Sequence, residues 1–92
     1  MNKPANAFED LAKQSDQLLE HVFYLNMKAC DICIQGIDKL EEQGKNHGAG
    51  RELIVNYLNK HRAVVRGVIE VLGYEPDFME CHERYANAVS ND

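Results

Sequence analysis

Cysteine and histidine are the side chains in this 92-residue chain best suited to chemistry, and the chain has three cysteines and four histidines. Two of the cysteines form a C-x-x-C pair, and the third is followed directly by a histidine. Because tetrahedral zinc takes four thiolate or imidazole ligands, the chain holds enough donors for one such site. The candidate metal ligands are Cys30, Cys33, Cys81, His61 and His82.

The position of the C-x-x-C pair argues against that site. Zinc pairs of this type usually lie on tight turns, and redox pairs open a helix after a strand, whereas a helical pattern runs straight through Cys30 and Cys33. Free cysteine is also one of the most frequently buried residues. We therefore expect reduced core cysteines and no cofactor, and zinc binding is the alternative.

His61 lies in the middle of an apolar helix face, between Tyr57 and Val64. We expect a core histidine whose ring nitrogens bond a tyrosine, an asparagine or a carbonyl group, and a metal ligand or pocket residue is the alternative. His82 occupies a similar position further along the chain. His21 and His47 are expected to be exposed.

Signatures of catalysis are missing from the sequence. It contains no phosphate-cradling glycine loop, no H-E-x-x-H and no G-x-S-x-G. A di-iron helical bundle needs Glu-x-x-His pairs, but the residue three positions before each of His21, His61 and His82 is apolar. We therefore predict that the chain is not an enzyme.

The chain is acidic, with a formal net charge of −5, which gives no overall electrostatic basis for binding nucleic acid. Residues 49–73 nevertheless carry four bases and two acids. Three of those bases share one edge of a helix and could contact an anionic partner, so a nucleic-acid-binding protein is a further alternative. These residues are Arg51, Arg62 and Arg66.

Residues 6–43 are expected to form one long helix, because apolar residues recur at steps of three and four and glycine is absent before Gly36. Such a helix is about 57 Å long. Its apolar arc spans about 200°, roughly twice what packing on one neighbour requires. We expect it to be covered from two sides.

Part of that arc repeats every seven residues, which suits packing in a helical bundle. We predict that it forms a homodimer interface, in which the polar Asn26 either fixes the register or bonds to the backbone or solvent. Tyr24 and Met27, on or near the polar side, are expected to be exposed contact residues. The predicted interface residues are Leu18, Val22, Leu25, Asn26, Ala29 and Ile32.

The remaining residues are expected to fold back on the long helix. Residues 44–50 contain three glycines and fit a loop between antiparallel helices. A second helix is predicted over 51–72 and a third, shorter one over 76–89. The sequence thus predicts a single all-α domain over residues 1–92: an antiparallel helical hairpin with a short third helix, in a dimeric bundle.

The chain shows no secretory signal, and no apolar run exceeds four residues, so we expect no membrane contact. An odd number of cysteines without an export signal favours the cytoplasm. We predict a small cytoplasmic interaction or regulatory protein that acts by binding a macromolecular partner, as a homodimer. A helical bundle that binds a metal or a small ligand through its cysteines and histidines is the alternative.

Overall fold

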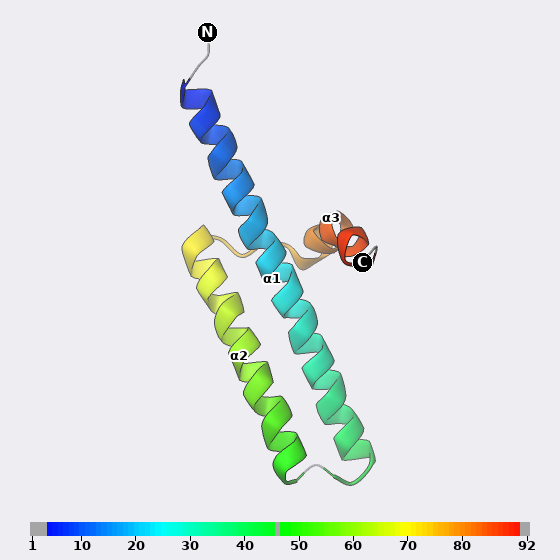
Figure 1. Cartoon of the computed structure of the whole chain (residues 1–92). Helices are drawn as coiled ribbons and strands as arrows, with labels where there is room; N and C mark the ends of the chain where they lie inside the picture. Colours follow the sequence, from blue (N-terminus) through cyan, green and yellow to red (C-terminus); the bar gives the residue numbers. More distant parts are fainter. Residues whose placement is uncertain (1–3, 46, 91–92) are drawn as a thin grey trace.

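A computed structural model describes residues 4–45 and 47–90 (Figure 1). These residues form three helices and no strand, so the predicted all-α class is confirmed. The helices are α1 (Pro4–Glu42), α2 (Ala49–Leu72) and α3 (Phe78–Ser90).

The long helix α1 begins two residues earlier than predicted. Proline fits the first helical position, because its missing N–H would have no partner there and its φ is already helical. Asn6, the first residue of the predicted helix, lies inside α1, and its side chain is outside the part that the structure describes. The helix ends where Gly44 takes a left-handed φ of 69° and Lys45 N–H donates to the carbonyl of Leu40 at 2.7 Å.

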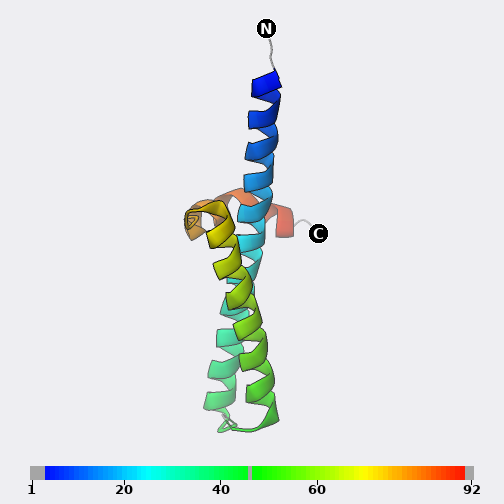
Figure 2. The same ribbon diagram turned by 90° about the vertical axis from the view of Figure 1, so that its left-hand side faces the viewer.

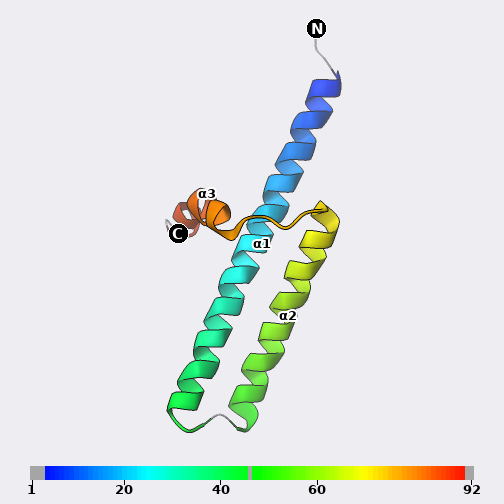
Figure 3. The same cartoon turned by 180° about the vertical axis from the view of Figure 1, so that it is seen from behind.

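Helix α2 runs back beside the C-terminal part of α1, in the opposite direction (Figures 1 and 3). It begins two residues before the predicted Arg51 and ends at the predicted residue, Leu72. Gly73 terminates it with a left-handed φ of 83°, and its N–H donates to the carbonyl of Ile69 at 2.9 Å.

Helix α3 packs on the other side of α1 from α2, and it crosses α1 transversely (Figures 1 and 2). It begins at Phe78, two residues later than predicted, because Asp77 caps it instead of joining it. The carboxylate of Asp77 accepts a hydrogen bond from Glu80 N–H at 3.0 Å. Pro76 is buried in the linker over residues 73–77.

The core lies where the three helices meet. The buried cluster consists of Phe23 and Tyr24 from α1, Val68 from α2 and Cys81 from α3. The molecule is elongated, with extents of 66 × 27 × 20 Å, so much of its length is only one helix pair thick. Several apolar side chains are packed around the cluster and only partly buried: Leu19, Met27, Val65, Ile69, Leu72, Phe78, Tyr85 and Ala86.

The prediction that Tyr24 and Met27 are exposed is wrong. Tyr24 is 2% exposed and Met27 is half-buried. The reason is that α3 covers the side of α1 that the periodicity of the sequence places near solvent. The Tyr24 ring lies 5.5 Å from that of Phe78, and its hydroxyl is 2.9 Å from Nδ1 of His82. A tyrosine can be buried at low cost when its hydroxyl keeps a hydrogen-bond partner.

His21 was also expected to be exposed, and it is half-buried. Its ring stacks on that of Tyr85 from α3, with centroids 4.6 Å apart and planes 8° apart. This stacking is a second contact through which α3 covers α1.

Candidate interaction surface

Four large apolar side chains, seven residues apart, form an exposed row along α1. They are Leu11, Leu18, Leu25 and Ile32, and the exposed fractions of Leu18 and Ile32 are 68% and 66%. A seven-residue spacing keeps side chains on one face of a helix. Since α2 and α3 pack on other sides of α1, this row stays exposed among the residues that the structure describes.

A row of smaller residues runs beside the first one, also at seven-residue intervals. Its members are Ser15, Val22, Ala29 and Gly36. Together the two rows have the alternating three- and four-residue spacing of a coiled-coil seam. Of the predicted interface residues, Leu18, Val22, Leu25 and Ile32 are exposed, whereas Asn26 and Ala29 are half-buried.

Helix α2 carries a matching exposed apolar row, which the predicted interface does not include. Its four residues lie within about 40° of one another on the helix. We call this α2 row, together with the α1 row of large apolar side chains that begins at Leu11 and ends at Ile32, the open face. The α2 members are Leu53, Tyr57, Val64 and Val71, all exposed.

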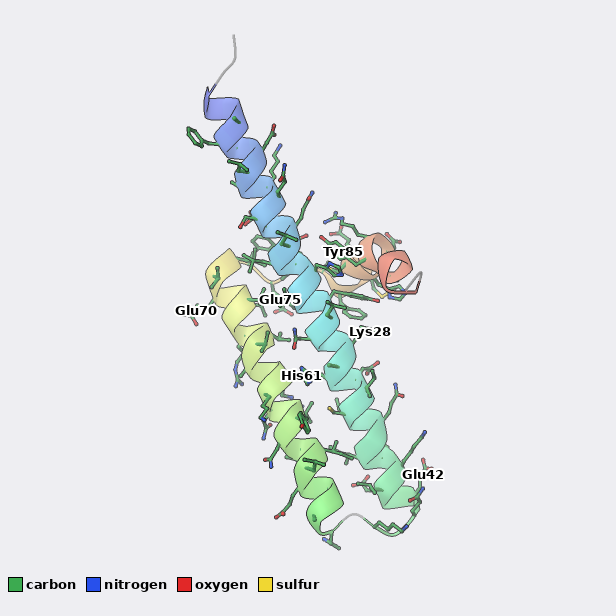
Figure 4. The ribbon with its side chains drawn as sticks, in the orientation of Figure 1. Lys28, Glu42, His61, Glu70, Glu75 and Tyr85 are labelled. Carbon is green, nitrogen blue, oxygen red and sulfur yellow. The ribbon has the colours of Figure 1, made fainter. Side chains whose placement is uncertain are left out.

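Between the two helices the open face is hollowed into a groove of about 370 Å³. Three of the four α1 residues that line it are small. Figure 4 shows His61 lying between α1 and α2. The lining residues are Ala29, Ile32, Cys33, Gly36, Ile54, Tyr57 and His61.

A hydrogen-bonded pair connects α1 and α2 beside this groove. Asn26 Nδ2 donates to the carbonyl of Val22 at 2.9 Å, so Asn26 Oδ1 faces His61 as an acceptor. His61 Nδ1 therefore donates to that oxygen, at 2.8 Å. This asparagine is one of the partners expected for His61, and the bond leaves only Nε2 of the imidazole for any other contact.

The five candidate metal ligands are spread over the molecule. Cys33 and His61 share the groove, whereas Cys81 is buried in the core and His82 bonds to Tyr24. Within residues 4–45 and 47–90, no group of three or more potential ligands is close enough to hold a metal ion.

The cysteines differ in their environments. Burial raises the pKa of the Cys30 thiol, although the charge of Arg62 opposes the effect. Burial also raises the pKa of Cys81, and the carboxylate of Glu20 adds to this. Cys33 is half-buried and lines the groove, so it is the most accessible thiol of the three.

The basic edge of α2 is present but does not form a concentrated positive patch. Arg62 and Arg66 are exposed and border a hollow together with Cys30 and Val65, while Arg51 is half-buried in the first turn of α2. The hollow is lined mainly by apolar side chains, which suits packing more than phosphate binding.

Glu20 joins three parts of the chain, a role that the sequence analysis missed. One of its carboxylate oxygens accepts a hydrogen bond from the Tyr74 hydroxyl at 2.6 Å, and the other pairs with Arg84 at 2.9 Å. The carboxylate raises the pKa of Tyr74 to about 12. Nearby, the Tyr85 hydroxyl donates to the backbone carbonyl of Gln17 at 3.0 Å. These contacts hold the linker and α3 against α1.

In the described part of the chain, no helix is long and apolar enough to cross a membrane. No protein family, curated protein or solved structure matches the chain.

Proposed function

We propose that this chain is a small helical interaction protein that works as a homodimer, in which α1 and α2 form an antiparallel hairpin and the open face is the dimer interface. The observation that supports this proposal is the double apolar row. Soluble monomers rarely expose a long continuous apolar surface, and such surfaces usually mark sites of association. The seven-residue spacing on both helices fits helical packing against a second copy.

In this proposal the dimer binds a macromolecular partner by surface complementarity and makes or breaks no bonds. Acidic residues are available for a partner on the outer surfaces of α1 and α3, which the open face does not include. The three free cysteines fit a reducing compartment, and we propose the cytoplasm.

Native mass spectrometry of the reduced protein, with light scattering over a range of concentrations, tests the dimer. We expect twice the chain mass, and we expect Leu25→Ser to shift the protein toward monomer. Met79→Ser is the matched control, because Met79 is an exposed apolar residue of α3 outside the open face. A wild-type protein that is monomeric throughout would exclude the proposal.

The same spectra address the alternative function. A dimer without additional mass supports the interaction protein. Additional mass equal to zinc or a small molecule, lost in Cys33→Ser or His61→Ala, would instead favour a ligand-binding bundle that uses the groove.

The partner is tested by affinity capture from the native host. We expect the wild-type dimer to retain a stoichiometric macromolecule and Leu25→Ser to retain less of it. Recovery of the chain alone would contradict the binding part of the proposal and leave the dimer intact.

A further inference from the structure

The N-terminal part of α1 extends beyond the end of α2 (Figure 1). Every side chain from Ala7 to Leu18 is exposed, including Phe8 and Leu11. We call residues 7–18 the N-terminal arm. A single helix of this length is unstable in water without packing, so the arm has a strong physical reason to acquire a partner.

We propose that the two α1 helices of the homodimer pair in opposite directions, so that the N-terminal arm of each copy fills the groove of the other. This inference rests on the proposed function, since it needs a dimer, and it specifies what occupies the groove.

The sizes of the residues in the two rows favour opposite directions. In a parallel pair, identical residues lie at the same height, so that small residues such as Ala29 and Gly36 would meet their own copies and leave voids. In an antiparallel pair, each layer joins the large row of one helix with the small row of the other. Large side chains then face small ones, which is how well-packed helices interdigitate.

One antiparallel register matches large with small residues along the whole seam. It places Leu11 opposite the partner's Gly36 and Leu18 opposite the partner's Ala29. It also places Ser15 opposite the partner's Ile32. The partner residues in these layers are three of those that line the groove, so this register brings the N-terminal arm onto the groove.

The charges agree with this arrangement. The N-terminal arm contains three acids and one base, whereas residues 49–73 contain four bases and two acids. Lys60 lies beside the groove, with its Nζ 5.0 Å from the ring centroid of Tyr57. Antiparallel pairing puts the acidic arm next to Lys60 of the other copy, and parallel pairing would put two acidic arms together.

The linker leaves room for the second copy. The linker contacts α1 through the Tyr74–Glu20 hydrogen bond, and Glu20 lies about 140° around the helix from Leu25. Figure 3 shows the linker crossing one side of α1. The open face is therefore on a different side of α1 from the linker.

Crosslinking of the full chain tests the pairing. The variant Ser15→Cys adds one exposed thiol to the N-terminal arm, and a short bismaleimide can then join it to the native Cys33 of the partner subunit. We expect a covalent dimer with a 15–33 link, identified by peptide mass spectrometry. These positions are about 27 Å apart within one helix, so a short 15–33 link must connect two copies.

Two controls accompany this experiment. Ser15→Cys/Cys33→Ser should lose the link, and Met79→Cys should give no link to Cys33. Independently, Leu11→Ser should raise the dissociation constant of the dimer about a hundredfold, because each dimer loses two buried leucines and each is worth at least a tenfold change. Met79→Ser should leave that constant unchanged.

The outcomes separate this inference from the proposed function. A 15–33 link together with a weakened Leu11→Ser dimer supports the antiparallel pairing. Links of 15–15 and 33–33 would mean parallel helices, and a stable dimer without any link at residue 15 would mean a different interface. Either result overturns the antiparallel pairing while the dimer stands, whereas a monomeric wild-type protein overturns both proposals.

Discussion

Replacing Tyr24 measures how much the packing of α3 on α1 stabilises the fold. Tyr24→Phe keeps the ring and removes only the 2.9 Å hydrogen bond to His82. The expected loss of stability is about 1 kcal/mol, which is the usual net value of such a bond. Tyr24→Ala also removes the buried ring, which is 2% exposed in the fold, and should cost about 3–5 kcal/mol. In a chain of this size, about 1 kcal/mol lowers the melting temperature by roughly 4–8 °C.

The assay is thermal and urea unfolding followed by circular dichroism, at one fixed protein concentration because a dimer makes stability depend on concentration. Met79→Ala is the control: this side chain is exposed on α3 outside the open face, and its change should stay within about 0.5 kcal/mol. A double-mutant cycle with His82→Ala should return a coupling of about 1 kcal/mol with Tyr24→Phe. If Tyr24→Ala costs less than about 1 kcal/mol, the position of α3 described above is wrong.

Two further predictions concern the titration of Tyr74 and the relative reactivity of the three cysteine thiols. Because Glu20 accepts its hydrogen bond, the pKa of Tyr74 is raised from its ordinary value of 10.0 to about 12 in the fold. The resulting stabilisation is complete below pH 10 and is lost as the pH rises through 12. Tyr74 is 44% exposed, so solvent limits this contribution to about 1 kcal/mol. Tyrosinate absorbance should lose a titration step near pH 12 in Tyr74→Phe, and an unchanged titration curve in that variant would contradict the assignment. Among the thiols, Cys33 should react first with a thiol reagent, because burial raises the pKa of both Cys30 and Cys81. Cys33→Ser should remove the fast phase, and a fast phase that remains in that variant would count against this order.

The sequence was sufficient to predict the helices because their signals are local. Glycines mark the ends of α1 and α2, and apolar residues recur with helical period over long stretches. The largest differences in the helix bounds are two residues, at the start of each helix, where Pro4, Gly48 and Asp77 allow more than one first residue.

The sequence could not show which sides of α1 are covered. A helical wheel counts Tyr24 and His21 toward the polar side, and it contains no information on the distant residues that pair with them. His82 is 58 residues from Tyr24, and Arg84 is 64 residues from Glu20. Such contacts depend on where a short linker directs α3, and that direction leaves no periodic signal in the sequence.

The same reasoning explains the α2 row. Leu53, Tyr57 and Val64 belong to the apolar arc of α2, and the periodicity alone does not show whether such an arc is covered. The single chain has only one α1 to cover them, and α3 lies on the far side of it, so these side chains remain exposed.

The position of α1 between the other two helices has a consequence for unfolding. Helix α1 packs against both α2 and α3, whereas the backbones of α2 and α3 do not approach each other in the part of the chain described. Local opening of α3 therefore breaks contacts with α1 while the α1–α2 contacts can remain. Backbone amides of α3 should exchange with solvent at a lower free energy than those in the middle of α2, which makes α3 a separate cooperative unit within one small domain.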